Sequence, residues 1–180
     1  LLIHFVIMVF PLFIYFFPDY QPSTNVFKVT ALTVVLYTNS FGYQGLLMAR
    51  GKEKTIGIIA FFALILNIIL SAILVNVFYV SFEFVIVATL ITYVIYVFVL
   101  GIYGRKVLNL PTTFVSTLRD IYPWRMMIPF FISFLLIIFS LTNIYFIIPF
   151  FVYLFLNFND ILNIKGITIK IMKNPDFINI

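Results

Sequence analysis

Long apolar runs separated by short polar turns make up most of this chain. The runs predict six helices, at residues 1–17, 25–49, 55–79, 84–103, 126–141 and 144–158. A run of about 20 apolar residues is long enough to cross a bilayer as a helix. The alternation of polar and apolar residues that a membrane β-barrel requires is missing from these runs. The pattern therefore predicts an all-α, polytopic membrane protein built as a six-transmembrane-helix bundle.

The one long polar connection, over residues 104–125, contains a helical pattern of its own. Thr112 follows Pro111 and can cap a short helix. The apolar side chains of that helix fall on one face, namely Phe114, Val115, Leu118, Ile121 and Tyr122. Its polar side chains fall opposite, namely Ser116, Thr117, Arg119 and Asp120. We predict an amphipathic helix on the cytoplasmic membrane surface, with an irregular polar loop as the alternative.

The tail, residues 159–180, alternates apolar and polar side chains between positions 167 and 172. This pattern is compatible with an interfacial strand and with a frayed chain end, and the sequence does not choose between them. We place the tail in the cytoplasm.

Composition narrows the class of protein. The 180 residues are 64% hydrophobic and 9% charged, whereas soluble domains are about half apolar and about a quarter charged. The net charge of +5 would suggest nucleic acid as a partner of a soluble protein. Here the cations cluster at the ends of apolar runs, so membrane lipids are the expected surroundings and nucleic acid is not a partner. With Cys 0, disulfides and thiolate chemistry are excluded.

The basic residues predict the orientation in the membrane. Three cations lie in the turn at residues 50–54, and placing this turn inside also places inside every other Lys and Arg except Lys28. Cytoplasmic loops of membrane proteins carry an excess of Lys and Arg. We therefore expect a multi-pass protein of the bacterial cytoplasmic (inner) membrane with both ends of this segment in the cytoplasm. The chain starts without Met or a basic leader region, so we expect it to be part of a longer protein.

Polar residues inside the predicted spans supply the candidate site. The helix at 25–49 is the most polar, and Lys28, Asn39 and Tyr43 share one of its faces. A charge in the membrane costs about 2.5–3.5 kcal/mol at the helix centre. Lys28 therefore either contacts an anionic head group, such as a diphosphate, or extends to the interface from a helix end. Asn67, in the helix at 55–79, either contacts substrate or bonds a neighbouring helix.

Sequence signals of catalysis are missing. The chain has no metal-ligand cluster, phosphate-cradling glycine loop or nucleophile–base pair. All its acidic residues fall in or beside predicted loops, so no carboxylate pair is available in the membrane for acid–base work. Its single histidine, His4, is conceivable as a proton-coupling group, although simple packing also accounts for it. We predict a protein that is not an enzyme and that needs no cofactor or metal.

Several features together resemble one family of transporters. They are the segment from Pro11 to Tyr20, the polar helix that follows it, the turn Gly51-Lys52-Glu53-Lys54 after Leu46-Leu47-Met48-Ala49-Arg50, and the Asn67 helix. The sequence resembles the carboxyl-terminal half of polysaccharide-biosynthesis flippases, the exporters of O-antigen-type lipid-linked oligosaccharides. These belong to the MATE-like superfamily, which also holds multidrug and toxin extrusion antiporters and the lipid II flippase.

The resemblance implies a fold and a substrate. The family has two six-helix lobes around a central cavity and moves its substrate by alternating access. This chain would be one lobe, and an amino-terminal lobe of the same protein would complete the cavity. The implied substrate is an undecaprenyl-diphosphate-linked oligosaccharide for O-antigen or capsule biosynthesis. The residues expected to line the cavity are Lys28, Asn39, Tyr43 and Asn67.

Three other functions remain open at this point. A drug or cation antiporter of the same superfamily would need a buried carboxylate for coupling, and the six predicted helices contain none. A polysaccharide polymerase or membrane acyltransferase would need a large outer loop or an intramembrane histidine with polar partners. A non-catalytic membrane subunit of envelope polysaccharide assembly would also have short loops, and it is distinguished from a flippase by the Gly51-Lys52-Glu53-Lys54 turn and the polar second helix.

Overall fold

The computed structural model describes residues 1–81, 84–139 and 141–163, and all regular structure in these ranges is helical. The elements in chain order are α1 (Leu2–Phe16), η1 (Pro18–Ser23), α2 (Thr24–Thr38), α3 (Phe41–Ala49), α4 (Glu53–Asn76), α5 (Ile86–Val107), α6 (Phe114–Ile121), α7 (Trp124–Ile138), η3 (Asn143–Phe146) and α8 (Ile147–Leu156). The prediction of an all-α protein is confirmed for the described part of the chain.

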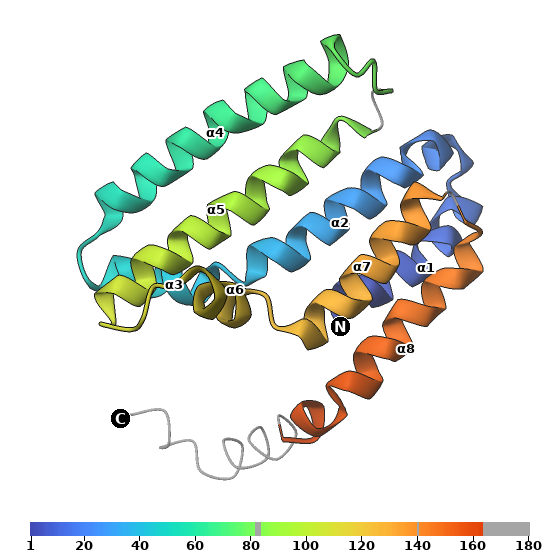
Figure 1. The fold of residues 1–180 in the computed structure, drawn as a ribbon. Helices are drawn as coiled ribbons and strands as arrows, with labels where there is room; N and C mark the ends of the chain where they lie inside the picture. The colour runs from blue at the N-terminus through green and yellow to red at the C-terminus, as the bar shows by residue number, and fades with distance from the viewer. Residues whose placement is uncertain (82–83, 140, 164–180) are drawn as a thin grey trace.

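The longer helices lie side by side, and α5 and α2 occupy the middle (Figure 1). Helix α4 packs on α5, α5 on α2, and α2 on both α1 and α7, while α8 packs on α7 and α1. The core lies where α2 meets α5, and Leu32, Leu36, Val97 and Leu100 are fully buried there. The short helices α3 and α6 lie together near one end of α5 (Figure 1). Helices α2 and α5 therefore have protein on both sides.

Two helices, α4 and α5, are long and apolar enough to cross a membrane. A third span results if α6 and α7, which meet at a bend of 73°, are counted as one. Helix α4 has no buried residue, although its apolar side chains run all round it. Such a surface is favourable only next to lipid or another apolar partner. These helices, with the composition, mark a membrane protein.

The prediction of six full-length spans is wrong for the described residues. Helix α1 covers 15 residues, and the η3–α8 segment is also a shorter apolar helix. At about 1.5 Å per residue, 15 residues reach about 22 Å, which is less than the roughly 30 Å of the hydrocarbon core. Run length alone overestimated these spans, because apolar residues in turns such as those around Phe17 and Ile144 lengthen a run without lengthening its helix.

The helix predicted at 25–49 is broken into α2 and α3 at Asn39 and Ser40. The backbone N–H groups of Asn39 and Ser40 donate to the carbonyls of Leu36 and Tyr37, three residues back instead of the four of an α-helix. The four-residue spacing returns in α3. The Ser40 hydroxyl also donates to the Tyr37 carbonyl at 2.7 Å. Side-chain hydroxyls and amides that compete for backbone partners bend and end helices. The polar residues of this segment were predicted to line a cavity, but Asn39 and Ser40 instead interrupt the helix.

The amphipathic helix exists, but its cap and its buried face differ from the prediction. Thr113, not Thr112, caps α6, and its hydroxyl accepts from the Ser116 N–H at 3.4 Å. Thr117 and Ile121 are the buried residues of α6, whereas Phe114 is 66% exposed, although its ring lies 5.2 Å from that of Phe98 on α5. Two more apolar side chains of the predicted face are exposed, namely Val115 and Leu118. Gly101 on α5 explains the rotation, because it leaves the space that the Ile121 side chain fills.

The predicted tail, residues 159–180, is described only in part. Residues 158–163 are helical and follow α8 after a single turn residue. The alternating segment at 167–172, for which a strand and a frayed end were both open, lies outside the described residues.

Candidate ligand cavities

Lys28 is a buried cation in the second turn of α2. Its side chain is 4% exposed, and its Nζ donates to the Asn143 Oδ1 at 2.6 Å. The ammonium also lies 4.3 Å from the centre of the Phe146 ring, within the range of a cation–π contact. No carboxylate of the described residues forms an ion pair with it. The positive charge is therefore held by a neutral amide and an aromatic face.

A cavity of about 360 Å³ adjoins this lysine. Its polar lining comes from η1, the start of α2 and the start of η3 with its N-cap, namely Gln21, Thr24, Asn25, Lys28, Thr142 and Asn143. Its apolar lining comes from α1, α7 and the segment that follows α7, namely Pro11, Ile14, Leu136, Ile137 and Leu141. An ammonium has three N–H donors and no acceptor. With one of them bonded to Asn143, this site is suited to an anionic group.

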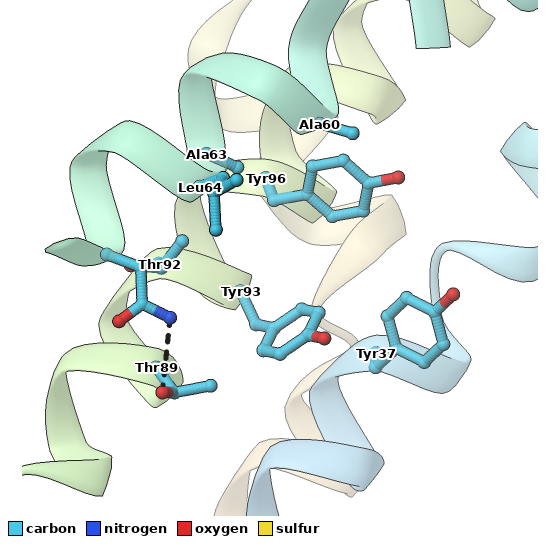
Figure 2. A pocket seen from close by; sticks show the side chains of 9 residues that line it. Tyr37, Ala60, Ala63, Leu64, Thr89, Thr92, Tyr93 and Tyr96 are labelled. Atoms are coloured by element: carbon cyan, nitrogen blue, oxygen red, sulfur yellow. Dashed lines mark hydrogen bonds between the residues drawn. The ribbon is translucent and has the colours of Figure 1, made fainter. Parts of the chain in front are cut away.

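A second pocket, of about 260 Å³, lies between α2, α4 and α5 (Figure 2). Its lining is rich in phenols and hydroxyls, with small residues from α4, and consists of Tyr37, Ala60, Ala63, Leu64, Asn67, Thr89, Thr92, Tyr93 and Tyr96. We call it the tyrosine pocket. Ala60 and Ala63 leave room opposite the rings of α5, which a larger residue on α4 would fill.

Hydrogen bonds hold the rim of the tyrosine pocket in place. Asn67 donates from Nδ2 to the Thr89 Oγ1 at 3.2 Å, the bond drawn in Figure 2, and its Oδ1 accepts from Ser71 at 3.2 Å. On the α3 side, Gln44 Nε2 donates to the Tyr96 hydroxyl at 2.8 Å. The pocket is thus tied to both α4 and α3.

The candidate residues from sequence do not meet in one cavity. Lys28 lines the first cavity and Asn67 the tyrosine pocket. Asn39 instead donates to the Ile121 carbonyl at 2.8 Å and to the Met126 sulfur at 3.4 Å. The Tyr43 ring lies against Gly104 of α5. Asn39 and Tyr43 therefore join helices in this structure, and neither lines either of these cavities.

Sequence reasoning missed the tyrosine pocket, although a signal for it existed. Thr89, Thr92, Tyr93 and Tyr96 follow the i, i+3, i+4, i+7 spacing of one helical face. None of the site residues predicted from sequence lies in this helix. The spacing alone could not identify Tyr37 and Asn67 as the residues that close the pocket from other helices.

His4 is buried and lies outside both cavities. Its Nδ1 is 3.2 Å from the Ser133 hydroxyl, and its ring is 5.8 Å from that of Tyr153. Its Nε2 has no hydrogen-bond partner among the described residues. The same residues contain no group of three His, Asp, Glu or Cys side chains able to hold a metal ion.

Comparison with known proteins found no similar family, protein or structure. No family model matches the chain, no curated protein matches it, and no solved structure matches it. The resemblance to flippases stays a prediction from sequence.

Proposed function

We propose that this chain is one lobe of a flippase that moves undecaprenyl-diphosphate-linked oligosaccharide across the bacterial cytoplasmic membrane by alternating access. The observation that carries the proposal is Lys28, a buried cation beside a polar cavity. The sequence resemblance supplies the carrier lipid and the two-lobe mechanism. By that resemblance, an amino-terminal lobe of the same protein forms the other wall of the path.

The surroundings of Lys28 favour an anionic ligand. Transfer of a charge from water into a protein or lipid interior is costly unless the charge is paired. Asn143 and Phe146 stabilise the ammonium only in part, because neither carries a negative charge. A diphosphate oxygen in the adjoining cavity would complete the pairing with a charge-assisted hydrogen bond.

The distribution of charge at the two ends of the helices suggests where the Lys28 cavity lies in the membrane. The α3–α4 turn and the α5–α6 connection lie at one end of the helices, and the α1–α2 connection at the other (Figure 1). The cation-rich turn at residues 50–54 belongs to the first end. We place that end in the cytoplasm on the positive-inside rule. The Lys28 cavity then lies near the outer surface, on the release side of the path.

The main alternative is a drug or cation antiporter. Such a transporter needs a carboxylate in the membrane to couple transport to an ion. The acidic residues that the structure describes are all exposed, namely Asp19, Glu53, Asp120 and Asp160. This part of the chain therefore favours an anionic substrate held by a cation over a cationic substrate held by a carboxylate.

Replacement of Lys28 tests the proposal in the protein that carries this chain. Loss of a hydrogen bond to a charged group costs about 1.5–3 kcal/mol, so Lys28→Ala should lower the initial rate of glycan export about tenfold to a hundredfold. Lys28→Arg should retain much of that rate because it keeps the positive charge. The measurement is the rate of lipid-linked oligosaccharide translocation in membrane vesicles, normalised to the amount of protein.

Lys106→Ala is the matched control. Lys106 is exposed in the last turn of α5, far along the chain from the cavity. Its replacement should leave the rate unchanged. Wild-type export by the Lys28→Ala protein would refute the head-group role and, with it, the observation on which the proposal rests.

A further inference from the structure

The tyrosine pocket is polar but carries no charge. Its hydrogen-bonding groups are phenols, threonine hydroxyls and the Asn67 amide, and no lining residue is acidic or basic. It lies along the first half of α5, a helix that is long enough to cross the membrane. A charged ligand would lose its hydration there without gaining an opposite charge. The lining therefore selects a neutral ligand.

One hydroxyl in the pocket is buried and unpaired. Thr92 is 6% exposed, and its Oγ1 has no hydrogen-bond partner in the described part of the chain. Threonine in a helix usually bonds the carbonyl one turn back, as Thr33 does with Val29 at 2.9 Å. An unsatisfied buried hydroxyl costs about 1–3 kcal/mol. A ligand hydroxyl in the pocket would remove that cost.

The tyrosine rings present a ligand with apolar ring faces and with phenol oxygens. Tyr37 and Tyr93 meet edge to face at 5.2 Å, and Tyr93 and Tyr96 at 6.3 Å. All three side chains line the pocket, Tyr37 from α2 and Tyr93 and Tyr96 from α5, together with Ala60 and Ala63 of α4 (Figure 2). The Tyr96 oxygen accepts from Gln44, so its own O–H proton remains available to a ligand.

The size of the pocket restricts the ligand to one small ring. Its 260 Å³ lies just below the range of about 300–1,000 Å³ typical of drug-sized ligands. A neighbouring hollow of about 210 Å³ shares Tyr37, Thr89 and Tyr93 with it and adds Thr30 and Thr33. The two hollows together form a hydroxyl-lined groove between α2 and α5, which extends beyond the tyrosine pocket.

We propose that the tyrosine pocket binds a single neutral pyranose ring, with the ring C–H groups against the tyrosine faces and a sugar hydroxyl on Thr92. The inference deepens the proposed function, on which it rests for the identity of the carrier lipid. Lys28 would hold the diphosphate, whereas the pocket would hold an uncharged sugar of the glycan. The groove next to the pocket has room for part of the following sugar of the glycan.

The nearest alternative ligand is an organic cation. A quaternary ammonium ion would gain from the tyrosine faces through cation–π attraction. It has no hydrogen-bonding group, however, so it would leave the Thr92 hydroxyl unpaired. A sugar satisfies both the rings and the hydroxyls, and this is why the observations favour it.

Saturation-transfer NMR on the full-length protein in lipid nanodiscs tests this inference. The probes are methyl β-glucopyranoside and methyl N-acetyl-β-glucosaminide, compared with methyl glucuronide and tetramethylammonium. We expect saturation of the ring C–H protons of a neutral glycoside and little saturation of the charged probes. The apparent Kd should rise about tenfold in Tyr93→Leu, from the loss of the ring, and about two- to tenfold in Thr92→Val.

The chain offers a matched control for each variant. Thr117 is a second buried threonine whose hydroxyl is unpaired in the described part of the chain, but it packs between α6 and α5 away from the pocket. Tyr103 is on α5 and is 43% exposed. Glycoside binding should be unchanged in Thr117→Val and in Tyr103→Leu. Thr92→Val changes the side-chain shape little, so it tests the hydroxyl even if Tyr93→Leu misfolds.

Three results would overturn the inference. They are binding of tetramethylammonium without the neutral glycosides, no binding of any probe by the folded wild-type protein, and glycoside binding that the pocket variants leave intact. Failure of the pocket is separable from failure of the proposed function. If Lys28→Ala slows export but the wild-type protein binds no glycoside, only the pocket is rejected. If glycoside binding depends on Thr92 but Lys28→Ala exports normally, only the head-group role of Lys28 is rejected.

Discussion

Asn39 acts as a link between two helix junctions. The last carbonyls of a helix have no partner within that helix. Ile121 ends α6, and its carbonyl accepts from the Asn39 amide at 2.8 Å. Asn39 itself sits at the break between α2 and α3. One side chain therefore satisfies the end of α6 from the point where another helix is interrupted.

Asn39→Ala should destabilise the protein through this carbonyl. A buried acceptor left without a partner costs about 1–3 kcal/mol. We expect a lower Tm in thermal unfolding of the purified protein in detergent, followed by circular dichroism. Asn76→Ala is the control, because Asn76 is exposed and bonds only its own helix at Ala72. Equal Tm values for the two variants would show that the Asn39–Ile121 bond contributes little.

Two glycines let α5 approach its neighbours closely. A side-chain carbon added at Gly101 would collide with Ile121 of α6, and one added at Gly104 would collide with the Tyr43 ring of α3. Between them and the end of α5, the buried Arg105 binds the connection to α6. It donates to the Pro111 carbonyl at 2.8 Å and to the Ser116 hydroxyl at 3.2 Å, and it forms an ion pair with Asp120. This end of α5 is the point where α3 and α6 attach.

Gly104→Ala should destabilise the protein, because overpacking of a fitted contact costs about 1–3 kcal/mol. Gly57→Ala is the matched control in α4. A side-chain carbon there meets nothing within 4 Å, and the loss of glycine from a helix stabilises by up to about 1 kcal/mol. The Tm should therefore fall in the first variant and hold or rise in the second. Addition of Tyr43→Ala should recover part of the loss in Gly104→Ala; if it recovers none, the Tyr43 contact is not the cause.

At the scale of the whole molecule, α4 and α5 determine how the chain is threaded through the membrane. They pack along each other, and each is long enough to cross. Helix α4 exposes apolar side chains on its outer face, while α5 lies between α4 and α2 (Figure 1). If both cross, the residues just before α4 and just after α4 must face opposite compartments.

Single cysteines test this threading, because these 180 residues contain no cysteine of their own and any cysteine elsewhere in the protein can be replaced by serine. Lys52→Cys precedes α4, Ser81→Cys follows it, and Lys106→Cys lies at the far end of α5. In intact cells, a membrane-impermeant maleimide should label Ser81→Cys only. Lys52→Cys and Lys106→Cys should react once the membrane is opened. Labelling of all three positions from the outside would contradict both the orientation and the crossing of α4.

The local features of this protein could be predicted from its sequence. Helical structure, the membrane character and the long α4 and α5 helices follow from run length and from the lack of alternation, which involve neighbouring residues only. The many polar residues between positions 25 and 49 were also visible in the sequence, but their structural role was not. Polar residues in a predicted span can face a cavity, bond another helix or break their own helix. The pattern along one segment is the same in all three cases.

Tertiary contacts decided the rest, because they join residues that are far apart in the chain. Lys28 meets Asn143 across 115 positions, and Asn39 meets Ile121 across 82. Which side of each helix faces its neighbour depends on small residues such as Gly101 and Gly104, whose effect appears only when another helix packs against them. The sequence by itself therefore determined that this is a helical membrane protein with a lone cation among polar residues. Only the packing of α2, α4 and α5 decided that the hydroxyls of those helices enclose a second, uncharged pocket.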